Sequence, residues 1–157
     1  MADTRDTATG IQGRDMAPFT LMIDPAPRDE DVRLLLEGLN GHAIAQAGTP
    51  PPQPLAIFLY DETERIVGGL QAQIWDGVLE IRLIWVHEDY RGEGYGKRLM
   101  DTAEAEGIAR GCGLATLRTF SYQAPEFYKK LGYEEYAVVE DWPRGHSKHA
   151  FRKHLTK

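Results

Sequence analysis

The residues from Val86 to Leu99 carry the densest chemical signal in the chain. An apolar run ends at Val86, glycines follow at positions 92, 94 and 96, and a helical pattern begins directly after the last of them. In this order the backbone N–H groups of the loop and the positive end of the helix dipole converge on one concavity. Glycine also lets a ligand approach the backbone closely, because it has no β-carbon. The loop is therefore predicted to bind a phosphate group.

Spacing excludes two common kinds of phosphate loop. A Walker loop requires glycine where this chain has Arg91, and Ser or Thr where it has Arg98. A dinucleotide fingerprint requires glycine at position 97, which is lysine. The pattern that remains, Arg91-x-x-Gly94-x-Gly96, resembles the coenzyme loop of the GNAT acetyltransferase superfamily.

The elements around this loop must form one sheet to position it. Alternating apolar runs separated by turn residues predict an antiparallel meander before the loop, and a helical period follows it. A strand, a helix and a further strand in succession imply that the two strands are parallel neighbours. The predicted elements are a strand Phe19–Ile23, a helix over Asp29–Leu39 that Asn40-Gly41 stops or kinks, a short helix His42–Ala47, strands Leu55–Tyr60, Ile66–Trp75 and Val78–His87, a helix Gly96–Arg110, a strand Leu114–Phe120, a helix Pro125–Leu131, and strands Tyr133–Glu140 and Ser147–Leu155.

A second segment strengthens the resemblance. Residues Ser121–Tyr133 resemble the family's helix that carries an aromatic-Tyr pair and ends in Leu-Gly-Tyr before a strand. The order of predicted elements is similar to that of the family from about residue 19 to 155. The resemblance implies an α+β fold, with a mixed, mostly antiparallel sheet of six to seven strands and about four flanking helices. It assigns residues 18–157 to the acetyltransferase domain and leaves residues 1–17 as an expected flexible tail.

The resemblance also implies that acetyl-coenzyme A is the acyl donor. Its pyrophosphate is expected on the amides of the glycine loop, with added charge from Lys97 or Arg98, and its pantetheine arm in a cleft between splayed parallel strands. The Val86 amide is expected to polarise the thioester carbonyl. Ser121 stands where the family commonly has Asn, which weakens the expected side-chain bond to the pantetheine. The expected coenzyme-binding residues are Ile84, Trp85, Val86, Arg91, Gly92, Glu93, Gly94, Tyr95, Gly96, Lys97, Ser121 and Tyr128.

Two residues are predicted to move protons. Tyr128 matches the family tyrosine near the coenzyme sulfur and is the expected general acid, with a packing tyrosine as the alternative; Phe127 is expected to pack. Glu80 lies eleven residues before Arg91, the offset of the catalytic glutamate in histone-acetylating relatives, and is the expected base.

Strict alternation along the strand places Glu80, Arg82, Ile84 and Val86 on one face. Apolar neighbours there would raise the pKa of Glu80 and Arg82 would lower it. An exposed Glu-Arg pair is the alternative for Glu80, and His87 and Asp141 are the reserve bases.

The loop between the last two strands is expected to overhang the acceptor site. It supplies Trp142, Arg144 and His146 as candidates for acceptor recognition, together with the segment Asn40–Gly48. An ordinary polar turn is the alternative. With 18 Lys and Arg against 24 Asp and Glu, the formal net charge is −6, which favours a cationic amine acceptor without identifying one.

Composition narrows the class of protein. A chain of 157 residues predicts one core, its acidic balance argues against nucleic-acid binding, and no window is apolar enough for a membrane helix. Cys112 is the only cysteine, which predicts a reducing, cytoplasmic location and an inert thiol. The spacing of His146, His149 and His154 does not predict a metal site.

The sequence therefore predicts an N-acetyltransferase that moves an acetyl group from acetyl-coenzyme A to a primary amine of a small molecule or peptide by direct attack. A non-catalytic acyl-coenzyme A sensor and an interaction module that retains the fold are the alternatives, and another acyl donor stays open. Homodimerisation through the C-terminal strands is expected by analogy only.

Overall fold

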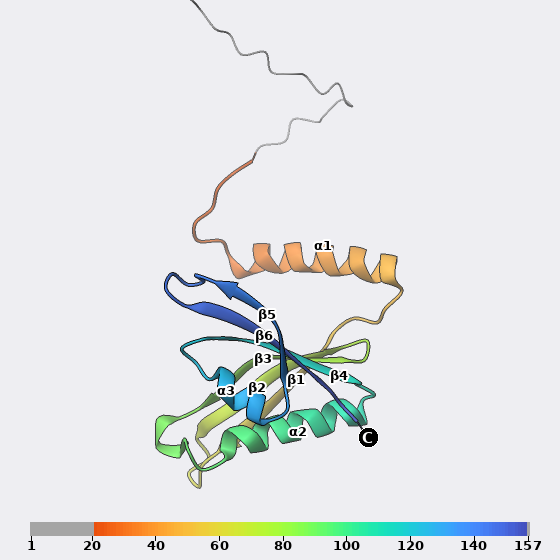
Figure 1. The fold of residues 1–157 in the computed structure, drawn as a ribbon. Coiled ribbons are helices and arrows are strands. Elements are labelled where there is room, and N and C mark those ends of the chain that lie inside the picture. The colour runs from red at the N-terminus through yellow and green to blue at the C-terminus, as the bar shows by residue number, and fades with distance from the viewer. Residues whose placement is uncertain (1–20, 157) are drawn as a thin grey trace, which may run out of the picture. The chain divides into compact units, whose positions relative to one another are not determined.

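The computed structural model describes residues 21–156 (Figure 1). They fall into two compact units, one that ends at Leu39 and one that begins at Asn40. The expected tail over residues 1–17 lies outside the described residues. The elements are α1 (Asp29–Ala47), β1 (Gln53–Tyr60), β2 (Ile66–Trp75), β3 (Val78–Val86), the short 3-10 helix η1 (Glu88–Tyr90), α2 (Tyr95–Ala109), β4 (Leu114–Phe120), α3 (Pro125–Lys130), β5 (Glu134–Glu140) and β6 (Ser147–His154).

The N-terminal region differs from the prediction in two respects. Leu21, Met22 and Ile23 form no strand, and the rest of the predicted strand, Phe19 and Thr20, lies outside the described residues. The two predicted helices are one continuous helix, α1, because the cost of Gly41 inside a helix, about 1 kcal/mol, does not outweigh the hydrogen bonds on either side. The helix ends at Ala47 and is followed by Gly48, whose φ of +66° suits glycine and whose N–H donates to the Ile44 carbonyl.

Six strands form one mixed sheet in the order β1-β2-β3-β4-β6-β5. β3 and β4 are parallel and every other neighbouring pair is antiparallel, which confirms the predicted meander and crossover. The described residues contain three α-helices rather than about four.

One face of the sheet, called here the inner face, packs against α2. Leu70, Leu79 and Ile81 are buried on it, and Leu99 and Met100 of α2 are buried against them. Gly107 lets the helix approach closely, since a β-carbon there would lie 3.1 Å from the Leu79 Cδ2. Figure 1 shows α2 running beneath the strands.

A β-bulge at Arg82 divides β3 and overturns the predicted alternation. Gln73 pairs with Glu80 and Gln71 pairs with Leu83, so the stretch of β3 between these pairs holds one more residue than that of β2. Glu80 therefore shares the outer face with Leu83 and not with Ile84. The bulge lies directly after Ile81, the last residue of β3 that pairs with β4.

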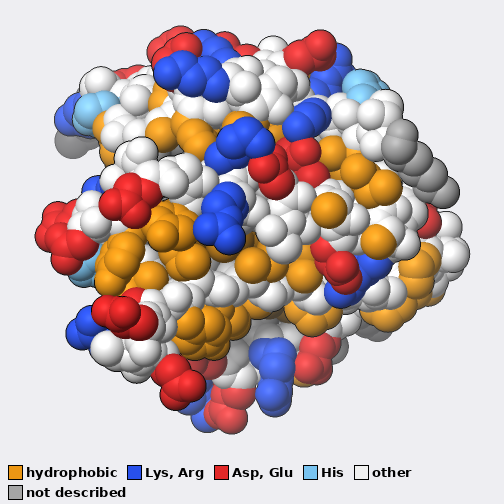
Figure 2. Space-filling model, turned by 90° about the horizontal axis from the view of Figure 1, so that it is seen from below, with side chains coloured by type: hydrophobic (Ala, Val, Ile, Leu, Met, Phe, Trp, Pro, Cys, Tyr) orange, Lys and Arg blue, Asp and Glu red, His pale blue; other side chains and the backbone are white. Residues whose placement is uncertain are grey.

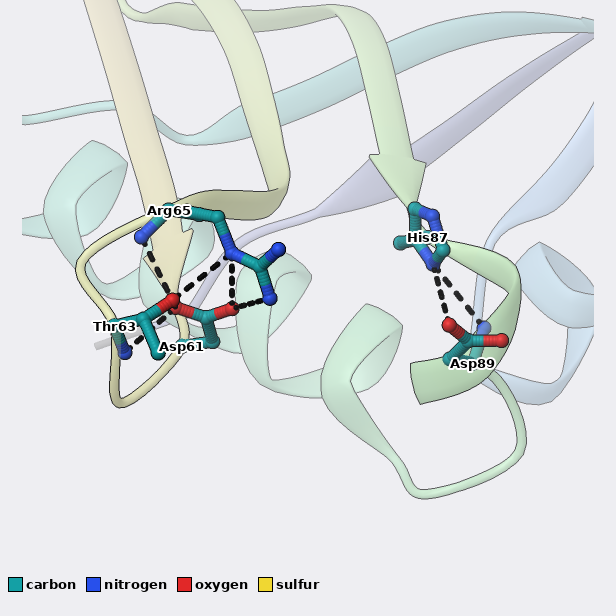
Figure 3. Close-up of polar contacts among 5 residues, drawn as sticks. All are labelled: Asp61, Thr63, Arg65, His87 and Asp89. Atoms are coloured by element: carbon teal, nitrogen blue, oxygen red, sulfur yellow. Dashed lines mark hydrogen bonds and ion pairs between the residues drawn. The ribbon is translucent and has the colours of Figure 1, made fainter.

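The turn between β1 and β2 is organised by one carboxylate (Figure 3). Asp61 accepts hydrogen bonds from the backbone N–H and hydroxyl of Thr63, and from the backbone N–H and guanidinium of Arg65. These bonds hold the pKa of Asp61 well below its usual range. The turn thus depends on a side chain rather than on a glycine.

Charges of both signs lie on the face of the molecule that Figure 2 draws. On the face drawn in Figure 2, acidic and basic side chains of the described residues are interspersed, with apolar side chains between them. No helix within residues 21–156 has the length and apolar character to cross a membrane.

Candidate active site

The sheet opens between its two parallel strands. The last paired residues are Ile81 of β3 and Leu117 of β4, and beyond them no pairing joins the two strands. A cavity of about 510 Å³ occupies the opening and is lined by both strands, by Gly96 at the start of α2 and by α3. The predicted splayed cleft is therefore present.

The β3 side of the cleft presents unpaired backbone groups. The His87 N–H points toward β2 and donates to the carbonyl of Val67 in that strand at 2.8 Å. Because successive N–H groups of a strand point to opposite sides, those of Val86 and Ile84 point away from β2 and toward the opening. Ile84, Trp85 and Val86 all line the cavity, as predicted. An extended ligand can pair with this edge as an added strand would.

A glycine loop closes one end of the cleft. Gly92 and Gly94 have φ values of +81° and +85°, a region that only glycine enters at low cost, and Gly94 is the N-cap of α2. The predicted explanation, close approach of a ligand, is incomplete, because the backbone itself needs these two glycines. At Gly96 a β-carbon would lie 3.3 Å from the Phe127 ring.

A hollow of about 320 Å³ lies against this loop. It is lined by the loop, Val86 and Phe127, and the first-turn N–H groups of α2 have no partner within the helix. Arg91 bridges the hollow and the cleft, since its Nε donates to the Val86 carbonyl at 2.9 Å. The predicted residues on the hollow are Arg91, Gly92, Gly94, Tyr95, Gly96 and Lys97; Glu93 does not line it.

Tyr128 reaches the cleft from α3. Its side chain is only 7% exposed, packs against Phe151 with ring centroids 6.0 Å apart, and still lines the cavity. Burial raises the pKa of Tyr128 above its ordinary value, so the phenol keeps its proton at neutral pH. Its hydroxyl forms no hydrogen bond within residues 21–156.

The residues predicted as bases lie outside the cavity lining. Glu80 is on the outer face and its carboxylate accepts a hydrogen bond of 2.7 Å from the Gln73 amide. His87 caps η1, where its Nδ1 accepts from the Asp89 N–H and lies 3.5 Å from the Asp89 carboxylate (Figure 3). Asp141 closes its own loop by accepting from the Gly145 N–H at 2.7 Å.

Ser121 is hydrogen-bonded to Ser147, the first residue of β6. Its hydroxyl accepts from the Ser147 N–H and its own N–H donates to the Ser147 carbonyl, and it does not line the cavity. Gln123 lines the cavity instead, with its side-chain oxygen held by the Thr119 hydroxyl and the Phe120 N–H.

Aromatic side chains gather beside the cleft. Phe120 and Tyr122 stack with ring centroids 5.4 Å apart, Trp142 meets Phe120 edge-on, and His146 lies 4.9 Å from the Tyr122 ring. Tyr122 lines the cavity, so it connects the predicted residues Trp142 and His146 to the cleft. Arg144 forms no hydrogen bond or ion pair with a described residue.

Among the cavity residues that the sequence did not predict are Arg82, Arg118, Tyr122 and Gln123. Alternation along Leu114–Phe120 would have placed Arg118 on the outer face beside the opening. Nothing in the sequence marks the bulge that brings Arg82 there.

Within the described range, the His, Cys, Asp and Glu side chains form no group of three or more that would hold a metal ion. Cys112 is buried, which raises the pKa of its thiol.

Comparison with known proteins agrees with this geometry. Residues 53–135 match the acetyltransferase (GNAT) domain family. The blasticidin-S acetyltransferase of Streptomyces morookaense is 34% identical over 106 residues, which cover 67% of this chain and 78% of that protein. An acetyltransferase from Bacillus cereus has a crystal structure with a TM-score of 0.70 and 36% identity, covering 86% of this chain and 98% of the other.

An aminoglycoside 6'-N-acetyltransferase solved with coenzyme A shares the fold, with a TM-score of 0.60 at 19% identity over 82% of this chain and 91% of its own. Loop, cleft and relatives agree, and the chain belongs to the GNAT acetyltransferase family and is an acyltransferase.

Proposed function

We propose that this enzyme transfers the acetyl group of acetyl-coenzyme A directly to a primary amine of a small molecule or peptide. The observation that carries the proposal is a single opening in the sheet that joins three features. The N-terminus of α2 with its free N–H groups lies at one end, unpaired β3 amides line the side, and the buried Tyr128 faces the interior.

The proposed donor site uses backbone groups for most of its contacts. The pyrophosphate would accept hydrogen bonds from the glycine-loop and first-turn amides, and Lys97 would add charge. The pantetheine would lie along Ile84–Val86. The chemistry of these groups fits the donor, because phosphate oxygens accept hydrogen bonds and the start of α2 presents N–H donors that have no partner within the helix.

The proposed reaction is a single displacement. The amine nitrogen forms a bond to the acetyl carbon, the carbon–sulfur bond breaks, and the departing thiolate takes the Tyr128 proton. The Val86 N–H would donate to the carbonyl oxygen as negative charge develops there. The raised pKa of Tyr128 supports its role as the acid, because an acid must still carry its proton when the thiolate leaves.

Glu80 is the proposed base, and it would act through water. Its carboxylate lies on the outer face one residue before the last paired position, and outside the cavity lining. A water between the carboxylate and the amine would carry the proton, which leaves a neutral nucleophile.

Acceptor recognition is proposed for Trp142 and His146, supported by their contacts with the Phe120–Tyr122 stack. The similarity to a blasticidin-S acetyltransferase supports a small-molecule amine as acceptor. Arg144 lies in the same loop, and we propose that it also contacts the acceptor.

We also propose a homodimer and a cytoplasmic location. A homodimer through β5 is supported by an edge strand whose residues are all exposed, including the apolar Val138 and Val139. The cytoplasm is the proposed compartment, because the single Cys112 cannot form an internal disulfide.

Calorimetric titration with acetyl-coenzyme A, coenzyme A and ATP tests the donor site. We expect micromolar binding of the first two and none of ATP. Thiol release with an amine panel then tests transfer. Binding without thiol release from any amine would favour a non-catalytic sensor, and no coenzyme binding would overturn the proposal.

A further inference from the structure

Two arginines flank the point at which the sheet opens. Ile81 and Leu117 are the last paired residues of β3 and β4, and the next residue on each strand is an arginine, Arg82 and Arg118. Both line the cavity of about 510 Å³. The opening therefore begins at two arginines on neighbouring strands.

Both side chains belong to the outer face. Along β4, Leu117 and Thr119 are buried on the inner face, so Arg118 between them points outward and is exposed. Arg82 is the extra residue of the bulge, and its Nη1 lies 3.3 Å from the Oε1 of Gln73, which is an outer-face residue paired with Glu80. Tyr128 reaches the same cavity from the inner side, so the arginines and the proposed acid lie on opposite sides of the opening.

Neither arginine has a carboxylate partner within residues 21–156. Arg82 has only the neutral Gln73 amide, and the nearest acidic neighbour along the strand, Glu80, is held by the other end of that amide at 2.7 Å. Lys148 adds a third positive charge on this side, over the Phe120 and Trp142 rings. Cations that line one cavity without a counter-ion repel each other, and an anion bound between them removes that repulsion.

The coenzyme does not account for this charge. Its phosphates are proposed at the other end of the cleft, where Arg91, Lys97 and the glycine loop already supply donors. The thioester end carries no negative charge before the reaction. The anion that fits the arginines must therefore arrive with the other substrate.

We propose that Arg82 and Arg118 form a subsite for a carboxylate of the acceptor, so that the enzyme prefers amines that also carry a carboxylate group. Each planar guanidinium can donate two parallel hydrogen bonds to a carboxylate. This inference rests on the proposed function and names its acceptor class. The formal charge of −6 favours a cationic acceptor at long range, whereas the arginines select the carboxylate at contact.

Matched acceptors isolate the carboxylate. The test compares kcat/KM for 4-aminobutyrate, 5-aminovalerate and lysine with that for their carboxamides, corrected for the fraction of neutral amine. We expect at least one carboxylate to exceed its carboxamide by about 100-fold, as loss of charge-assisted hydrogen bonds to two groups implies. Equal values for every pair would overturn the proposal.

Two variants assign the preference to residues. Arg82→Gln and Arg118→Gln should each reduce the carboxylate-to-carboxamide ratio about tenfold. Arg152→Gln is the matched control, since Arg152 is an exposed arginine of β6 outside the cavity, and it should leave the ratio unchanged. An equal loss of kcat/KM with both acceptor types would overturn the subsite. A loss of coenzyme affinity with no change in the carboxylate-to-carboxamide ratio would do the same, because either result would show that the arginines serve another purpose.

A binding measurement separates this inference from the proposed function. Melting temperatures are compared with coenzyme A plus 4-acetamidobutyrate and with coenzyme A plus 4-acetamidobutanamide, which requires no turnover. Greater stabilisation by the carboxylate, lost in Arg118→Gln, would support the subsite even if no amine were acetylated. Acetylation of amines without any carboxylate preference in either measurement would keep the proposed function and remove the subsite.

Discussion

The two ends of the cleft present different kinds of group, backbone N–H groups at one end and side chains at the other. At the glycine loop, the available groups are backbone N–H donors fixed by the start of α2 and by two residues with positive φ. At the point where the strands part, they are the side chains of Tyr128, Arg82 and Arg118. A backbone site depends on conformation and tolerates many side chains, whereas the other end depends on single atoms. This difference implies that the donor end is broken by adding atoms and the reacting end by removing them.

The largest effect is expected from removing one oxygen at the reacting end. Tyr128→Phe should lower kcat about 1000-fold with little change in coenzyme affinity, because general acid catalysis contributes about 10²- to 10⁴-fold. Stopped assays of thiol release and calorimetry measure the two quantities. Tyr133→Phe is the matched control, as Tyr133 is buried in the same aromatic cluster, 6.2 Å from the Tyr128 ring, but does not line the cavity. Equal losses in both variants would mean that Tyr128 only packs.

The pH profile offers an independent check on Tyr128. The acid must be protonated, and burial raises its pKa above 10.0, so activity should not fall on the alkaline side below that pH through loss of this proton. An alkaline limb near pH 8 that Tyr128→Phe abolishes would contradict the assignment of a raised pKa.

Breaking the donor end requires added bulk. Gly94→Trp should weaken coenzyme A binding about 100-fold, as expected when two charge-assisted hydrogen bonds of about 1.5 kcal/mol each are lost. Calorimetric titration gives the dissociation constant. Gly111→Trp is the control, because Gly111 also has a φ of +85° and open space around it but lies outside both cavities. A similar loss of affinity in both variants would trace the effect to strain rather than to the site.

The same contrast explains how much could be predicted from the sequence. Glycines at fixed spacing before a helical pattern indicate backbone conformation, so the loop, the parallel strands and the position of Ile84–Val86 on the cleft were predictable. Side-chain positions depend on the register of the sheet. The bulge at Arg82 moves Glu80 to the face of Leu83, and the sequence carries no local mark of the extra residue. Ser121 does not line the cavity, and its hydroxyl is instead hydrogen-bonded to Ser147 of β6, which is distant in the sequence.

Glu80→Gln tests a proton path that passes through water. We expect kcat/KM to fall about 100-fold at pH 7, the lower end for general base catalysis, since Gln73 holds the carboxylate outside the cavity lining. The deficit should shrink as pH rises, because solution then supplies more of the neutral amine. Glu134→Gln, on the exposed edge strand β5, should behave as the wild type. A deficit that stays constant from pH 7 to 10 would leave Glu80 with a structural role alone.

The smallest effect is expected where side-chain bonds hold the backbone but lie away from the cleft. Asp61→Asn should lower the melting temperature at pH 7 and leave coenzyme affinity unchanged, because the Thr63 and Arg65 groups then lose an ionised acceptor. The pKa of Asp61 is lowered in the folded protein, so its contribution is fully present above the unfolded value of about 4. It is lost as pH falls toward the folded value. Melting curves should therefore converge for wild type and variant in acid, while Glu62→Gln in the same turn shows no such convergence. Parallel curves across pH would mean that the carboxylate adds no stability.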